Sequence, residues 1–157
     1  MSEKNYTRRL VLTGLIATPL AAGLFGTRAM AATSAVYIED GVAWDGYDPV
    51  AYFTVGEPTP GSKDYAFDYN GVTVLFSNSE NRDLFAADPM KYAPQYGGYC
   101  AYAMSKGYIA PTIPEAWTIY DDKLYLNFSL RARELWSEDI PGNIVKGDKN
   151  WPGILSA

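Results

Sequence analysis

Two stretches of β-prone residues, each divided by a short polar turn, stand out in the hydrophobic pattern of the chain. Residues 65–76 are rich in aromatic and β-branched side chains on both sides of an Asn-Gly pair at 70–71. Residues 117–128 have the same character on both sides of an Asp-Asp pair at 121–122. Apolar runs around such a two-residue turn are typical of β-hairpins. The pattern therefore predicts two hairpins, the second with its acidic tip in solvent.

A helix signal follows the first hairpin. The sequence Ser-Asn-Ser-Glu at 77–80 has capping-box spacing, and its second and third residues can also act as the cap. It predicts a helix over 79–87, with Leu84 and Phe85 facing inward. The Asp-Pro pair at 88–89 should end or turn this helix, because the residue before a proline avoids the helical region.

The second hairpin is followed by helix signals of the same kind. Ser129 predicts the start of a helix over about 130–138, with Leu135 and Trp136 on its apolar face. Residues 140–148 predict another short helix with a proline in its first turn. No internal repeat is visible. The order hairpin, helix, hairpin, helix is typical of a small α+β domain.

The first 31 residues have the order of a secretory signal. Arg8 and Arg9 precede an apolar stretch over 10–25, and Ala-Met-Ala follows at 29–31. These are the features of a twin-arginine export signal with its cleavage site. The apolar stretch is shorter than the roughly 20 residues that span a bilayer. We therefore expect a mature domain over residues 32–157, periplasmic or otherwise exported; the alternative is an uncleaved N-terminal anchor.

Removal of the signal changes the charge of the working protein. The full chain has 13 basic and 18 acidic residues, of which the first 31 residues contain four and one. The mature domain then has 9 basic and 17 acidic residues, a formal charge of −8 (9 − 17). An acidic surface repels phosphate backbones, so nucleic acid is not an expected partner. No second apolar segment is long enough to cross a membrane.

Several segments of the domain match one family pattern. They are Gly-Tyr-Asp-Pro-Val-Ala-Tyr-Phe at 46–53, the stretch 76–85, and Asp-Pro-x-Lys-Tyr at 88–92. Together they resemble the YHS-domain family, and Tyr-Gly-Gly-Tyr-Cys-Ala-Tyr-Ala at 96–103 is similar to a stretch of its exported branch. The resemblance covers about 45–152 and implies one small YHS-like domain, in a family that occurs in metal-handling proteins. Residues 46–53 themselves predict a turn that runs into an apolar, strand-like segment.

The thiols of those metal-handling relatives are missing here. The resemblance aligns their first cysteine with Ala51 and their methionine with Phe53. It aligns their Phe-Cys-Ser with Phe-Ser-Asn at 76–78 and their next cysteine with Asn81. A cysteine-rich site of that kind suits soft or borderline metals. The resemblance therefore implies the fold, while metal binding does not carry over at these positions.

Cys100 is the only cysteine, and the chain has no histidine. An internal disulfide, a Ser-His-Asp triad, a Cys-His pair and a histidine-ligated metal are therefore excluded. If residues 101–106 are helical, Cys100 and Met104 lie on one face, and this soft pair suits copper as Cu(I), with a third ligand from elsewhere. An inert thiol packed among tyrosines and a reactive thiol at a helix N-terminus remain alternatives.

Tyr96, Tyr99 and Tyr102 surround Cys100 in a segment rich in tyrosine and glycine. Tyrosine combines apolar area with one polar tip, which suits ligand pockets and interfaces. These tyrosines and Cys100 are candidates for binding a small ligand; the alternative is that the tyrosines build the core. Asp48 is expected to fix a turn before a proline and is a further candidate for ligand binding.

These features predict a non-catalytic, exported module of the YHS type that binds a small ligand or a metal ion. No residue is assigned a catalytic role. One alternative is a thiol-dependent enzyme or redox protein that uses Cys100. The other is an interaction module that docks on another exported protein through its aromatic surface.

Overall fold

Helices and two small β-sheets alternate along residues 32–157, which are the residues that the computed structural model describes. The α+β class is therefore as predicted, whereas the predicted signal over residues 1–31 lies outside the described residues. The described part belongs to one compact unit, Ala31–Ala157. None of its helices has the length and apolar character needed to cross a membrane.

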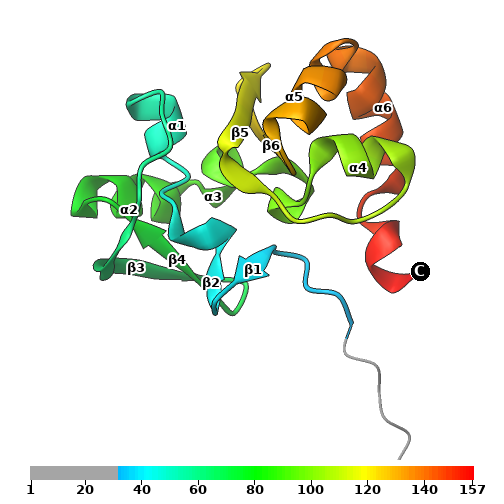
Figure 1. Ribbon diagram of the computed structural model, residues 1–157. Coiled ribbons are helices and arrows are strands. Elements are labelled where there is room, and N and C mark those ends of the chain that lie inside the picture. The colour runs from blue at the N-terminus through cyan, green and yellow to red at the C-terminus, as the bar shows by residue number, and fades with distance from the viewer. Residues whose placement is uncertain (1–31) are drawn as a thin grey trace, which may run out of the picture. The chain divides into compact units, whose positions relative to one another are not determined.

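The chain order of the elements is shown in Figure 1. The first half contains β1 (Ile38–Glu39), β2 (Val42–Ala43), the 3₁₀ turn η1 (Trp44–Gly46), α1 (Ala51–Thr54), β3 (Ser62–Tyr69), β4 (Val72–Phe76), α2 (Ser79–Ala87) and α3 (Pro89–Tyr92). The second half contains η2 (Gln95–Gly98), α4 (Ala101–Lys106), β5 (Ile113–Tyr120), β6 (Lys123–Asn127), α5 (Leu130–Ser137), α6 (Ile140–Asn150) and η3 (Gly153–Ser156).

Each half is organised around its own sheet (Figure 1). The first sheet has the strand order β1-β2-β4-β3, in which β2 lies parallel to β4 and the other neighbours are antiparallel. The second sheet is the hairpin β5-β6. Helix α2 packs against β3 and β4, and helices α4 and α5 pack against the second hairpin. Both predicted hairpins are confirmed.

Both hairpin turns use residues with a left-handed backbone. Asn70 and Gly71 have φ values of 53° and 79°, and Asp121 and Asp122 have values of 52° and 56°. Two consecutive positive φ values are what a type I′ turn requires, and the twist of that turn matches the twist of the flanking strands. Asn, Asp and Gly tolerate this conformation better than other residues do. The two turns are therefore a local property of the sequence.

The helices after the hairpins begin at their predicted caps. The side chains of Asn78 and Ser129 accept hydrogen bonds from the backbone N–H three residues later, at 2.8 and 3.0 Å. Phe85 is fully buried as predicted, but Leu84 is 37% exposed, so the prediction that both face inward is wrong for Leu84. Successive residues of a helix point about 100° apart, and here only Phe85 reaches the core.

The strand-like segment predicted before residue 54 is helical instead. α1 spans Ala51–Thr54, and Asp48 Oδ1 accepts hydrogen bonds from the N–H groups of Val50 and Ala51 at 2.9 and 3.2 Å. A carboxylate that satisfies the first N–H groups stabilises a helical turn. This local capping outweighs the β-propensity of the apolar side chains, and it confirms the expected role of Asp48 in fixing the turn.

The two halves repeat one arrangement of elements. Each half passes from a left-handed turn through a short helix and a hairpin to a longer helix. The hairpins pair in the same register 51 positions apart, with Ser62 opposite Phe76 and Ile113 opposite Asn127 (113 − 62 and 127 − 76). Both hairpins also have a register shift directly after this pair. The structure therefore contains a repeat that is not visible in the sequence.

Backbone angles agree between the halves as closely as the strand pairing does. Asn78, the cap of α2, has φ −157° and ψ 171°, and Ser129, the cap of α5, has φ −156° and ψ 168°. Asp88 and Asp139, the N-caps of α3 and α6, have φ −150° with ψ 76° and φ −150° with ψ 74°. Both pairs are 51 positions apart (129 − 78 and 139 − 88). The repeat therefore lies in the backbone, with different side chains at matching positions.

Aromatic side chains fill the core of both halves. The ring centroid of Phe85 lies 5.2 Å from that of Phe76 and 5.3 Å from that of Tyr69. In the second half Trp136, the counterpart of Phe85 (136 − 85 = 51), has its ring 4.9 Å from that of Tyr125. Close aromatic pairs of this kind bury large apolar area and add to it a favourable ring–ring term.

Candidate functional site

A cavity of about 360 Å³ lies in the second half, between the start of α4 and α5. Its walls are mostly carbon, from alanine, leucine and aromatic side chains, and Arg131 is the one charged residue that lines it. A mainly apolar hollow of this size with few polar groups is typical of small-molecule sites. The lining residues are Cys100, Tyr102, Ala103, Tyr108, Ala110, Phe128, Ser129, Arg131, Ala132 and Leu135.

Cys100 forms part of the cavity wall and is held from several sides. It is the N-cap of α4, and its Sγ accepts a hydrogen bond from the Ala103 N–H at 3.4 Å. The thiol donates to Asn127 Oδ1 at 3.5 Å, and the Cys100 N–H donates to the Ala110 carbonyl at 3.0 Å. Cys100 is 1% exposed. Residues 101–106 are helical, which is the condition for Cys100 and Met104 to share a face, and Cys100 is the N-cap of this helix.

Asn127 approaches the thiol from the end of β6 and is fully buried. Its Oδ1 accepts hydrogen bonds from the Tyr102 N–H at 2.9 Å and from the Cys100 thiol. Its Nδ2 finds no hydrogen-bond partner among residues 32–157. An unpaired buried donor costs about 1–3 kcal/mol. Among the described residues, one amide donor beside the thiol is therefore left without an acceptor.

The first half has a polar network at the position that corresponds to the cavity. Asp48 is the counterpart of Cys100 by its hydrogen bonds, since the Asp48 N–H donates to the Thr59 carbonyl and the Cys100 N–H to the Ala110 carbonyl, which matches Thr59 at the 51-residue offset (110 − 59). The two residues themselves are 52 positions apart, one more than that offset, and Asp48 is fully buried. Its Oδ2 accepts hydrogen bonds from the Ser77 N–H at 2.8 Å, the Ser77 hydroxyl at 2.7 Å and Asn81 Nδ2 at 2.7 Å. With the two N–H groups at the start of α1, five donors satisfy this carboxylate. A buried charge requires such partners.

Apolar groups replace the donors of this network in the second half. Phe128 occupies the position of Ser77, and Ala132 occupies that of Asn81 (128 − 77 and 132 − 81). Both Phe128 and Ala132 line the cavity. The Phe128 N–H, the counterpart of the N–H that binds Asp48, makes no hydrogen bond within residues 32–157. The cavity therefore lies where the first half has its hydrogen-bonded carboxylate.

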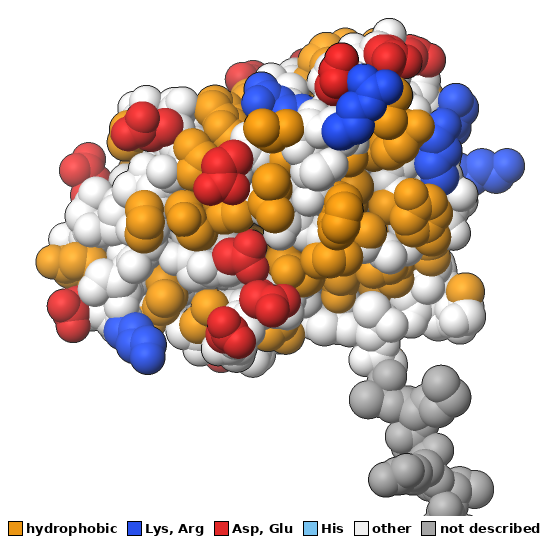
Figure 2. Space-filling view, viewed as in Figure 1, with side chains coloured by type: hydrophobic (Ala, Val, Ile, Leu, Met, Phe, Trp, Pro, Cys, Tyr) orange, Lys and Arg blue, Asp and Glu red, His pale blue; other side chains and the backbone are white. Residues whose placement is uncertain are grey.

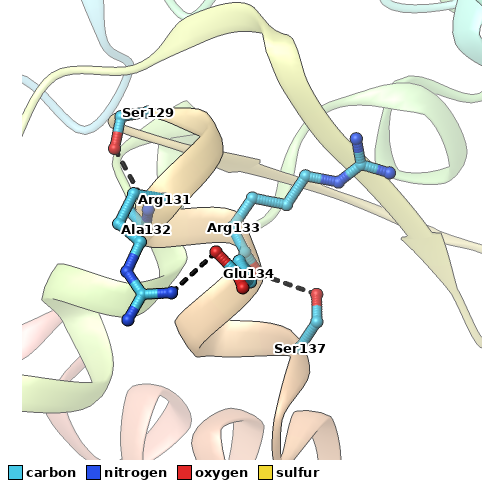
Figure 3. Close-up of polar contacts among 6 residues, drawn as sticks. All are labelled: Ser129, Arg131, Ala132, Arg133, Glu134 and Ser137. Carbon is cyan, nitrogen blue, oxygen red and sulfur yellow. Dashed lines mark hydrogen bonds and ion pairs between the residues drawn. The ribbon is translucent and has the colours of Figure 1, made fainter.

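Two basic side chains, those of Arg131 and Lys106, lie at or next to residues that line the cavity. Arg131 projects from the first turn of α5 to a different side from Arg133 (Figure 3), and its Nη1 lies 2.7 Å from Glu134 Oε2. The two side chains of this pair are 65% and 67% exposed, so solvent screens the pair and it contributes little to stability. Lys106 Nζ lies 5.0 Å from the ring centroid of Tyr102. Figure 2 shows apolar side chains over the region of α4, and acidic side chains nearer β1 and β2.

Two of the predicted ligand-binding residues, Cys100 and Tyr102, meet at the cavity. Tyr96 is buried elsewhere, and its hydroxyl donates to Asp148 Oδ1 at 2.9 Å. Burial and this hydrogen bond raise the pKa of Tyr96 above its ordinary value. Tyr99 is also buried and donates to a backbone carbonyl near the start of the described part, at 2.8 Å. These contacts fit the alternative in which tyrosines build the core.

The two candidate copper ligands pack in different clusters. Met104 belongs to the main core cluster with Trp136, whereas Cys100 belongs to a smaller cluster with Ala103 and Ala132. No three His, Cys, Asp or Glu side chains gather as metal ligands within the described residues. Cu(I) selects soft thiolate and thioether ligands, and the one sulfur among the cavity-lining residues is that of Cys100.

Sequence reasoning missed most of the cavity wall. Phe128, Arg131 and Ala132 follow the second hairpin and are far along the chain from Cys100. Their types alone indicate nothing about a site. The signal that could have found them is the offset of 51 residues, because it places them opposite the residues around Asp48.

The comparisons with known proteins do not identify a relative. No family model matches the chain, and neither the curated proteins nor the solved structures contain a match. The geometry of the cavity and of its counterpart in the first half is therefore the basis for the function.

Proposed function

We propose that this chain is an exported, non-catalytic binding module of the YHS type, which holds a small organic ligand in the cavity beside Cys100. The observation that carries the proposal is the cavity of about 360 Å³ with mainly carbon walls and a buried thiol. The hollow opens to the surface beside a core side chain, and its mainly apolar lining with few polar groups is the pattern of small-molecule sites. The twin-arginine signal over residues 1–31 delivers the domain to the periplasm.

The first half supports the YHS assignment. The resemblance aligns the thiols of the metal-handling relatives with Ala51, Ser77 and Asn81. All three residues donate hydrogen bonds to the Asp48 carboxylate, Ala51 and Ser77 through their N–H groups and Asn81 through its side chain. Three positions that are far apart in the chain thus meet around one carboxylate. A binding site shared by the thiols of the relatives would require these same positions to lie close together. In this chain the Asp48 carboxylate and its hydrogen bonds occupy that place, and the open cavity lies in the second half.

The surroundings of Cys100 favour binding over thiol chemistry. A catalytic thiol is accessible and is activated by a base or a positive group. The Cys100 thiol is almost completely buried and donates its hydrogen to Asn127, and the chain has no histidine to act as a base. A second candidate function is docking on a partner protein, which is favoured by the exposed rings of Tyr108 and Phe128 at the cavity mouth (53% and 54%).

Native mass spectrometry of the protein exported by its own host tests the proposal. We expect a mass above that of the polypeptide, which returns to the polypeptide mass on denaturation. Ala132→Phe fills the cavity and should abolish the adduct. Ala86→Phe, at an exposed position of α2, is the matched control and should keep it. If the wild type shows the polypeptide mass alone, or if both variants keep the adduct, the proposal is wrong.

A further inference from the structure

We propose that the ligand is an amphiphile with one carboxylate head and an apolar body. The head binds at the start of α5, near the Phe128 N–H and the Arg131 guanidinium, and the body fills the rest of the cavity. This inference rests on the proposed function, because it names the chemical class of the ligand for the same cavity.

The first half already holds a carboxylate at the counterpart of this position. Asp48 Oδ2 lies 2.8 Å from the N–H of Ser77, the residue before the cap of α2. Phe128 is the residue before the cap of α5, and its N–H has no partner within the described residues. Cys100 replaces the carboxylate with a shorter, uncharged side chain. The second half therefore keeps the backbone donor and lacks its acceptor, which a ligand carboxylate supplies.

The charge of a neighbouring side chain changes sign between the halves. Glu80 in the first turn of α2 corresponds to Arg131 in the first turn of α5 (131 − 80 = 51). The N-terminal end of a helix favours an acidic residue and disfavours a basic one. Arg131 therefore opposes the helix dipole, and a bound carboxylate relieves this repulsion. Its present partner, Glu134, forms an exposed ion pair that a ligand can displace at little cost.

The walls select the rest of the ligand. Ala103, Ala110 and Ala132 leave a hollow of about 360 Å³, within the range of roughly 300–1,000 Å³ that small-molecule sites occupy. A saturated chain of medium length with a carboxylate is a probe of this class. Burial of its methylenes supplies favourable free energy, whereas a small anion alone is repelled by the acidic domain. The body therefore supplies the affinity and the carboxylate the orientation.

Calorimetric titration of the exported protein, freed of co-purified ligand, with decanoate and with decan-1-ol tests the head group. We expect decanoate to bind about tenfold more tightly than the alcohol. Arg131→Gln should remove most of this preference by weakening decanoate alone. Arg133→Gln is the matched control, because Arg133 is on the same helix but donates to Thr118 Oγ1 at 3.2 Å and projects to another side (Figure 3). It should leave both affinities unchanged.

The outcomes separate this inference from the proposed function. Equal affinity of the wild type for the two probes overturns the carboxylate head and leaves the ligand cavity standing. Equal loss of decanoate binding in R131Q and R133Q also overturns it, because net charge then explains the effect. If neither probe binds, the inference is wrong, and the native mass measurement decides the proposed function independently.

Discussion

Cys100 and Asp48 occupy the same position in the two halves of one repeated fold. Each accepts a hydrogen bond from the N–H three residues later, at 3.4 Å from Ala103 and 3.2 Å from Ala51. The N–H of each donates to a carbonyl of the loop before its hairpin, at 3.0 and 2.9 Å. The two residues therefore share a capping role. Their surroundings differ, because five hydrogen-bond donors surround Asp48 whereas a cavity adjoins Cys100.

Asp48→Ala should be strongly destabilising. The change leaves the donors of Ser77 and Asn81 buried without their acceptor, and we expect a loss of about 3 kcal/mol or more in the free energy of unfolding. Asp48→Asn keeps one accepting oxygen and should lose less. Asp64→Ala, at an exposed position of β3, is the control and should stay within about 0.5 kcal/mol of the wild type. Urea unfolding measures all three, and similar midpoints for D48A and D64A would contradict the prediction.

Installing the first-half residues in the second half should rebuild the polar network. Cys100→Asp alone places a carboxylate against Phe128 and Ala132, and we expect it to cost about 3 kcal/mol. Adding Phe128→Ser and Ala132→Asn supplies the missing donors, so the triple variant should be at least about 1 kcal/mol more stable than additivity of the three changes predicts. It should also lose the ligand adduct. If the effects of the three changes on the free energy of unfolding simply add, the positions of Asp48 and Cys100 are not equivalent.

Gly147→Ala should destabilise the protein, although alanine normally stabilises a helix interior by up to about 1 kcal/mol over glycine. A Cβ at Gly147 would lie 2.6 Å from the Tyr96 hydroxyl oxygen and 2.8 Å from its Cζ. Tyr96 is buried and bonded to Asp148, so it cannot move away freely. We expect a loss of about 1–3 kcal/mol in thermal or urea unfolding. Gly153→Ala, where a Cβ meets open space, should be near neutral; a loss of the same size there would refute the steric explanation.

Asp45→Asn should stabilise the protein at neutral pH. Burial, followed by repulsion from Glu39 and Asp40, raises the pKa of Asp45 above its ordinary value near 3.9. Between about 3.9 and the raised pKa the folded state binds more protons than the unfolded state, so Asp45 makes stability fall as pH rises through that window. The variant should gain up to about 1 kcal/mol at pH 7, because solvent screens part of the effect, and the gain should vanish towards pH 3.5.

Asp122→Asn is the matched control for this pH dependence. Asp122 has the same left-handed φ of 56° as Asp45, but it is exposed and is not among the charges that raise the pKa of Asp45. Any preference of asparagine for that backbone therefore affects both variants equally. In urea unfolding, the two variants should differ in their free energy of unfolding at pH 7 and should not differ at pH 3.5. A gain for D45N that grows as the pH falls would reverse the assigned sign.

Cys100 should react slowly with iodoacetamide in the folded protein. Its thiol is buried and hydrogen-bonded, so alkylation requires local opening, and we expect a rate on the order of 100-fold below that of the urea-unfolded chain. Ser79→Cys in a Cys100→Ala background places one thiol at an exposed helix start and should react at the unfolded rate. Fast labelling of native wild-type protein at neutral pH would instead favour the thiol-dependent enzyme.

Residues a few positions apart in the chain account for most of the secondary structure. The turns at 70–71 and 121–122 and the caps Asn78 and Ser129 were predictable, because a positive φ or a capping hydrogen bond involves neighbours within about four residues. The same reasoning failed at Ala51–Thr54, where apolar side chains indicate a strand. There the helical turn depends on hydrogen bonds to Asp48, which Ser77, directly after β4, and Asn81 of α2 hold in place.

Which residues meet depended on the packing of distant segments. Tyr96, Tyr99 and Tyr102 lie within one stretch of seven residues (96–102), yet only Tyr102 lines the cavity. The repeat escaped notice because the halves keep their backbone pairing while their side chains differ, as Asp48 and Cys100 do. Backbone hydrogen bonds tolerate many side chains, whereas a cavity is set by side-chain volumes that remote segments bring together. The hairpins and caps are thus determined by residues close together in the chain, whereas the cavity beside Cys100 exists only in the folded domain.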